Sequence, residues 1–140
     1  MVDVGPASRA SQRAMDAVAD GQVPRPMTAW HCCLELYAVI TRLPAEVRVS
    51  PAIAHRLVRD EVLARFDVVQ LTEDRRLAFL QEVERERVVG GRTYDAHIAE
   101  VARLAGVGTV VTDNRRHFTT LARHGVVVLR SGELIEAAGL

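Results

Sequence analysis

The chain has 140 residues, of which 49% are hydrophobic and 26% are charged. This length is typical of one domain with its own core, and the composition excludes a disordered chain. No apolar run approaches the roughly 20 residues of a membrane-spanning helix, and residues 1–12 lack the apolar core of a secretory signal. We therefore expect a single domain over residues 1–140 that is cytoplasmic and has no contact with a membrane.

The formal net charge is zero, because the chain has 18 basic residues, all of them arginine, and 18 acidic residues. A globally basic nucleic-acid-binding surface is therefore not expected. The absence of lysine excludes a Walker A phosphate loop and a receiver-like phosphorylation switch, since both need that residue. The two cysteines, Cys32 and Cys33, are neighbours. Their spacing fits neither a disulfide nor a structural zinc site, so we expect two small buried residues.

Helical and strand patterns alternate along the chain. Ser50 is a candidate cap for the helix that begins at Pro51, Thr72 is one for a later helix, and Gly106 is placed to end another. The short strands are rich in valine, and this alternation indicates a parallel sheet with helices on both faces. In chain order, the expected elements are a helix at 7–21, an extended segment at 23–28, helices at 29–43 and 51–66, a strand at 67–71, helices at 72–88 and 93–107, a strand at 108–112, a short helix at 115–125, a strand at 126–129 and a helix at 131–140.

Polar side chains follow the strand "GTVVT", where Thr112 is succeeded by Asp113 and Asn114. Ligands in parallel α/β sheets bind outside the carboxyl ends of the strands. Asp95 lies at the start of the preceding helix, so it could reach the same edge. Ordinary turn chemistry is an alternative for Asp113 and Asn114, and a favourable interaction with the helix dipole is an alternative for Asp95.

Glu35 is a single carboxylate between Leu34 and Leu36 on an apolar helix. A buried carboxylate is costly unless it is paired, and a shared divalent cation would pair several at once. Mg²⁺ takes one or two carboxylates while it keeps its waters, and a bound water can act as a nucleophile. The alternative is an ion pair between Glu35 and Arg42 or another arginine.

The segments "LELYAVITRL", "GGRTYDAHIAEVARLAGVGTVVTDNRRHF" and "GVVVLRSGELI" together resemble PIN-domain proteins, particularly VapC-type toxins of type II toxin–antitoxin pairs. The resemblance runs from about Pro26 to the C-terminus. The family has a Glu on an early helix and an Asp at the start of a later helix. Glu35 and Asp95 occupy these positions here. The family pattern of Thr, one residue, then Asp or Asn, with His-Phe beyond, falls on residues 112–118.

The resemblance implies a PIN-like three-layer α/β/α fold with a small parallel sheet and a ribonuclease site that depends on Mg²⁺ or Mn²⁺. It implies a cognate antitoxin, an RNA substrate and a homodimer. Glu35 and Asp95 would hold the metal, with Asp3 as a third carboxylate, and residues 112–114 would orient the site. Arg115 or Arg116 would contact the RNA backbone, although a solvated arginine pair is the alternative. His117 has a surface or capping role as its simplest interpretation.

The sequence departs from the family pattern in two places. Only Met1 and Val2 precede Asp3, so the N-terminal strand is expected to be shortened or missing, and a start upstream is one explanation. Asn114 stands where Asp is frequent. We therefore predict a metal-dependent RNA endonuclease, with a catalytically impaired PIN-like module that still binds an antitoxin or another protein as the alternative.

Overall fold

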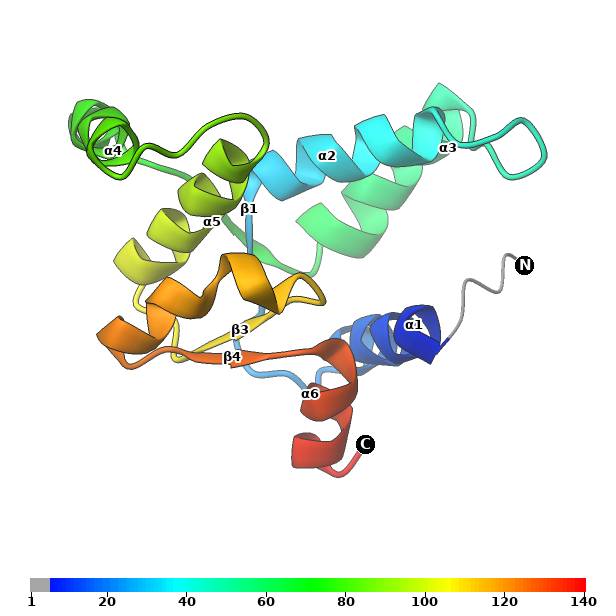
Figure 1. The fold of residues 1–140 in the computed structure, drawn as a ribbon. Coiled ribbons are helices and arrows are strands. Elements are labelled where there is room, and N and C mark those ends of the chain that lie inside the picture. Colours follow the sequence, from blue (N-terminus) through cyan, green and yellow to red (C-terminus); the bar gives the residue numbers. More distant parts are fainter. Residues whose placement is uncertain (1–5) are drawn as a thin grey trace. The chain divides into compact units, whose positions relative to one another are not determined.

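The computed structural model describes residues 6–140, and the chain divides into two compact units, Met1–Val69 and Gln70–Leu140 (Figure 1). Each unit combines helices with one pair of parallel strands. The predicted mixed α/β class with parallel strands is therefore confirmed, with the strands arranged as two separate pairs. The expected loss of an N-terminal strand concerns residues 1–5, which lie outside the described part of the chain.

The N-terminal unit is mostly helical. Its strands pair in parallel, with Met27 opposite Asp67. Ser50 caps the helix that follows it, because its Oγ accepts a hydrogen bond of 3.3 Å from the backbone N–H of Ile53. The elements are α1 (Pro6–Ala19), β1 (Met27–Ala29), α2 (Trp30–Thr41), α3 (Pro51–Leu57), the π-helical η1 (Val58–Leu63) and β2 (Asp67–Val69).

The C-terminal unit contains the second parallel pair, in which Thr109 lies opposite Val127. Its buried cluster comprises Ala99, Phe118, Leu121 and Val126, so one long helix and the segment after the first strand share a core. The elements are α4 (Glu73–Arg85), α5 (Arg92–Leu104), β3 (Thr109–Val111), the 3₁₀ helices η2 (Arg115–His117) and η3 (Thr119–His124), β4 (Val127–Leu129) and α6 (Ser131–Ala138).

The structure refines several expected elements. The short helix expected at 115–125 consists of two 3₁₀ helices, and Gly125 ends the second of them at φ +73°, a conformation that favours glycine. The strands at β2, β3 and β4 are confirmed. None of the described helices has both the length and the apolar character needed to cross a membrane.

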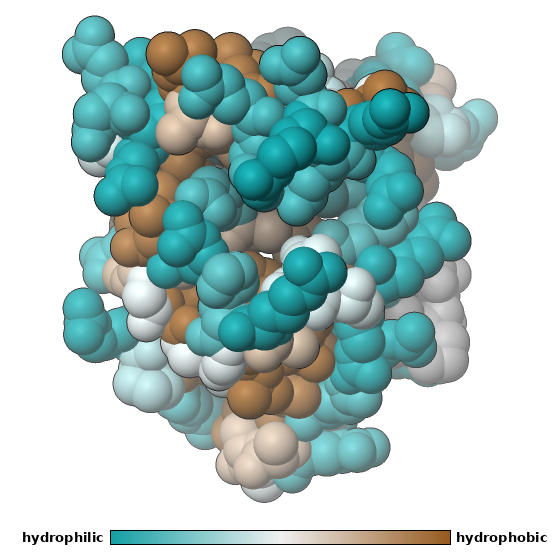
Figure 2. Space-filling model, turned by 60° about the vertical axis from the view of Figure 1, so that its left-hand side comes forward, coloured by the Kyte–Doolittle hydropathy of each residue, from teal (hydrophilic) through white to brown (hydrophobic). Residues whose placement is uncertain are grey.

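Helix α4 has no buried residue. Its apolar residues Leu77 and Leu80 are 66% and 59% exposed, so this stripe does not enter a core. Exposed hydrophobic patches lie between hydrophilic side chains on the face shown in Figure 2. The expectation that both cysteines are small buried residues holds for Cys33 and only partly for Cys32, and neither forms a disulfide.

Candidate active site in the C-terminal unit

The start of α5 and the segment after β3 meet through a carboxylate and an imidazole. Asp95 Oδ2 lies 2.5 Å from Nδ1 of His117, although the two residues are 22 positions apart in the sequence. Both side chains are mostly shielded from solvent, with exposed fractions of 24% for Asp95 and 21% for His117. A charge-assisted contact in such surroundings fixes the orientation of the carboxylate.

Asn114 joins this pair, because its side-chain amide lies 2.7 Å from the same nitrogen of His117. A ring nitrogen carries at most one hydrogen, so Nδ1 can donate to the Asp95 carboxylate or accept from the Nδ2–H of Asn114, but it cannot do both at once. Because Nδ2 is the Asn114 atom that faces the ring, the Oδ1 of Asn114 is not held by His117. Asp95 and Asn114 thus both lie within hydrogen-bond distance of one nitrogen of His117, and we call the three residues the Asp95–His117–Asn114 cluster.

Thr112 and Asp113 have local roles beside this cluster. Thr112 continues the pairing of β3 and β4, since its N–H donates to the carbonyl of Leu129 at 2.8 Å. Its hydroxyl accepts a hydrogen bond of 3.1 Å from the backbone N–H of Asn114, which shapes the turn. Asp113 instead accepts two hydrogen bonds of 3.0 Å from Ser131, one from the backbone N–H and one from Oγ. Its carboxylate therefore caps the first residue of α6.

The two arginines after Asn114 differ in their surroundings. Arg115 forms an ion pair with Glu133 of α6, and that carboxylate also accepts a hydrogen bond of 2.7 Å from the backbone N–H of Arg130. The Nε of Arg115 is buried and has no hydrogen-bond partner among the described residues. Arg116 is exposed. Arg115 is thus bound to the fold, while Arg116 faces solvent.

Glu35 lies on α2 in the N-terminal unit, and its side chain is 60% exposed. Its ion-pair contact is with His31, one helical turn earlier, whose Nε2 lies 3.9 Å from Oε2. The alternative partner expected from the sequence, Arg42, is not the residue that it contacts. Asp3 lies outside the described residues.

The oxygen donors of the Asp95–His117–Asn114 cluster are of the type that Mg²⁺ and Mn²⁺ accept. Asp95 supplies a carboxylate and Asn114 an amide, which fits a cation that keeps most of its waters. No group of three or more His, Cys, Asp or Glu side chains within residues 6–140 is arranged to hold a metal ion. These residues alone therefore fit an open, hydrated site and do not enclose one.

A cleft of about 610 Å³ lies in the same unit, lined by α4, α5 and the two 3₁₀ helices. Asp95 and His117 are part of its wall. Its apolar lining includes Phe79, whose ring meets that of His97 edge to face at a centroid distance of 5.6 Å. We call this feature the α4–α5 cleft. The candidate cluster consequently opens onto a concave surface large enough to receive part of a ligand.

Two features of this region were not assigned from the sequence. His117 was expected to have a surface or capping role, and the structure places it at the centre of the cluster. The signal was the His-Phe pair, in which the buried Phe118 anchors the turn that presents His117. The α4–α5 cleft has no signal of its own in the sequence, because it arises from the packing of separate helices.

The chain is thus a mixed α/β protein with a carboxylate, an imidazole and an amide gathered beside a cleft. It is similar to ribonuclease VapC40 of Mycobacterium tuberculosis strains CDC 1551 / Oshkosh and ATCC 25618 / H37Rv, with 31% identity over 85 residues in each case. The match covers 61% of this chain and 62% of each relative, so it spans less than two thirds of their length. No protein-family model and no solved structure matches the chain.

Proposed function

We propose that this protein is a metal-dependent endoribonuclease of the VapC toxin type, which hydrolyses RNA phosphodiester bonds. The observation that carries the proposal is the Asp95–His117–Asn114 cluster beside the α4–α5 cleft. The similarity to ribonuclease VapC40 supports the choice of RNA as the substrate class. The PIN-type fold and the cytoplasmic location belong to the same proposal.

In this proposal Asp95 holds Mg²⁺ or Mn²⁺, and Asn114 contributes an oxygen to the same site. The family resemblance assigns Glu35 and Asp3 as further metal-binding carboxylates. When bound, the metal would lower the pKa of a coordinated water and stabilise charge on a phosphoryl oxygen. His117 acts as a positioning residue, because it holds one oxygen of Asp95 and leaves the other available.

The remaining residues near the cluster have roles that are mainly structural. Asp113 contacts Ser131, so we assign Asn114 rather than Asp113 to the metal side. Thr112 orients the turn through its hydrogen bond to the backbone of Asn114. Arg115 is bound to Glu133, which leaves Arg116 as the member of that pair able to contact RNA.

A cognate antitoxin and a homodimer are further parts of this proposal, and both rest on the resemblance to VapC toxins. The alternative function is a protein-binding module that has lost catalysis. The observation that favours the alternative is that no cluster of three metal-binding side chains occurs in the described part of the chain.

The test is cleavage of a fluorescent single-stranded RNA by the purified chain, with Mn²⁺ or with EDTA. We expect cleavage only with Mn²⁺, and its loss in Asp95→Asn, a change that keeps the shape of the side chain but removes its charge. Asp20→Asn, an exposed acid just after α1, is the matched control and should cleave like the wild type. Binding of Mn²⁺, measured by electron paramagnetic resonance, provides a readout that is separate from activity. A folded wild-type chain that neither binds Mn²⁺ nor cleaves RNA would favour the binding module.

A further inference from the structure

The α4–α5 cleft has the dimensions of a groove for an extended chain. Its wall follows α5 from Arg92 to Arg103, a distance of roughly 16 Å at the rise of an α-helix. Asp95 lies one helical turn from the first of these residues, so the candidate cluster is near one end of the groove. A ligand that lies along α5 would therefore pass the carboxylate.

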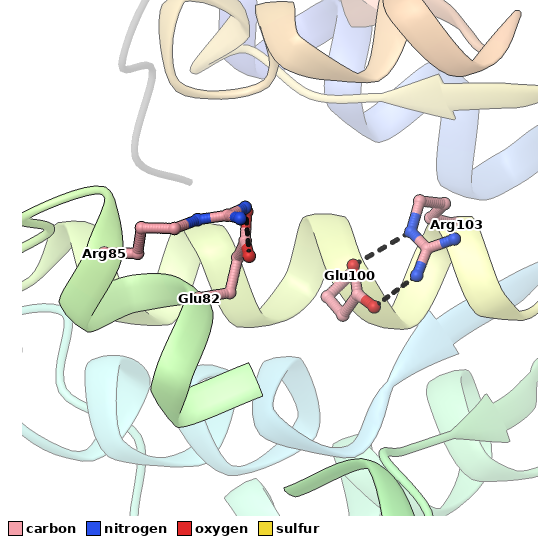
Figure 3. Close-up of polar contacts among 4 residues, drawn as sticks. All are labelled: Glu82, Arg85, Glu100 and Arg103. Carbon is pink, nitrogen blue, oxygen red and sulfur yellow. Dashed lines mark hydrogen bonds and ion pairs between the residues drawn. The ribbon is translucent and has the colours of Figure 1, made fainter. Parts of the chain in front are cut away.

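The arginines of the cleft fall into two groups. Arg85 and Arg103 are each paired with a glutamate of their own helix, Arg85 with Glu82 at 2.5 Å and Arg103 with Glu100 at 2.6 Å (Figure 3). The hydrogen bond from Arg85 lowers the pKa of Glu82, which is consistent with an ionised carboxylate that neutralises its neighbour. These pairs contribute little attraction for an anion.

Arg75, Arg92 and Arg123 form the second group. All three line the cleft and all three are exposed. Within residues 6–140, none of the three has a carboxylate at ion-pair distance. Since they come from α4, α5 and η3, the cleft presents guanidinium groups without an ion-pair partner from three separate elements. Guanidinium groups bind phosphate oxygens in a bidentate manner.

The apolar part of the lining complements these cations. Phe79 and Val83, which are both partly exposed, line the cleft between the charged positions. Bases of single-stranded RNA stack on aromatic and apolar surfaces, while their phosphates interact with cations alongside. A double helix would not place its bases against such a surface, so the lining fits a single strand.

We propose that the α4–α5 cleft binds the backbone of single-stranded RNA, with Arg92 and Arg123 contacting phosphates on the path that leads to Asp95. This inference rests on the proposed ribonuclease function and specifies the substrate-binding surface of the same site. It also accounts for RNA binding by a chain with no net charge, because the attraction is local to the cleft.

The experiment measures RNA binding and RNA cleavage separately. Binding of a fluorescein-labelled single-stranded oligouridine to the full chain is followed by anisotropy in EDTA, where no cleavage is expected. The variants are Arg92→Gln and Arg123→Gln. The matched control is Arg76→Gln, which removes the same charge from an exposed position of α4 outside the cleft. Thermal melts establish that all three variants are folded.

Each cleft variant should bind the RNA about fivefold more weakly near 0.1 M salt, and the slope of log K against log salt should fall by about 0.7, the contribution of one phosphate contact. Arg76→Gln should match the wild type in both quantities. Equal affinities for the wild type and both cleft variants would overturn the inference, even if the chain cleaves RNA with Mn²⁺. Failure of the wild-type chain to bind the RNA would overturn it as well. Weaker binding in the cleft variants by a chain that does not cleave would support the binding surface and contradict the proposed catalysis.

Discussion

Asp113 and Asn114 are neighbours with opposite predicted effects on stability and on metal binding. Asp113 accepts two hydrogen bonds from Ser131 at the start of α6, and Ser131 is buried. In Asp113→Ala both donors of the buried Ser131 lose this acceptor. We therefore expect Asp113→Ala to destabilise the fold and to leave Mn²⁺ binding intact.

The size of the destabilisation by Asp113→Ala follows from the hydrogen bonds that are lost. Removing one partner of a buried hydrogen bond costs about 1–3 kcal/mol, and loss of a helix cap costs about 0.5–2 kcal/mol. Asp113 itself is exposed, so solvent moderates the charge contribution and we expect about 2 kcal/mol in total. For a chain of this length that corresponds to a decrease in Tm of about 8 °C. Asp113→Asn keeps one acceptor oxygen for the backbone N–H of Ser131, so its decrease in stability should be about half as large.

The assay combines thermal unfolding followed by circular dichroism with Mn²⁺ binding followed by electron paramagnetic resonance. Asn114→Ala is the companion variant, because Asn114 lies next in the chain and is also exposed. It should melt close to the wild type and bind Mn²⁺ more weakly. If Asp113→Ala instead retained its Tm and lost Mn²⁺ binding, the assignment of these two residues would be reversed.

Two further predictions concern His117 and the cysteines. His117→Ala should weaken Mn²⁺ binding by about 10- to 100-fold, as is typical when a residue that orients a metal ligand is removed. His117→Asn should restore part of the affinity, because it keeps a donor near the position of Nδ1. Unchanged affinity in the alanine variant would contradict the positioning role. Burial raises the pKa of the Cys33 thiol, with the neighbouring Cys32 contributing in the same direction, and Cys33 is only 2% exposed. A higher pKa leaves less thiolate at a given pH, so iodoacetamide should modify Cys32 faster than Cys33 in timed mass spectrometry; equal rates would show that the burial of Cys33 does not limit its reactivity.

The order of helices and strands was accessible from the sequence because it depends on local patterns. Valine-rich runs bounded by turns predicted β2, β3 and β4, and the apolar spacing of residues 93–107 predicted α5. Ser50 was recognised as a cap from its position before Pro51. These features require only neighbouring residues, so a single sequence contains the information.

The sequence also located the polar residues of the candidate site at the end of β3 and at the start of α5, but only the tertiary structure determined their contacts. Asp113 and Ser131 are 18 positions apart, and Asp95 and His117 are 22 apart. Neither contact follows from helical or strand periodicity, because each depends on how separate elements pack. The same reason applies to the α4–α5 cleft, which Arg92 and Arg123 both line only once α5 and η3 have packed in the folded unit.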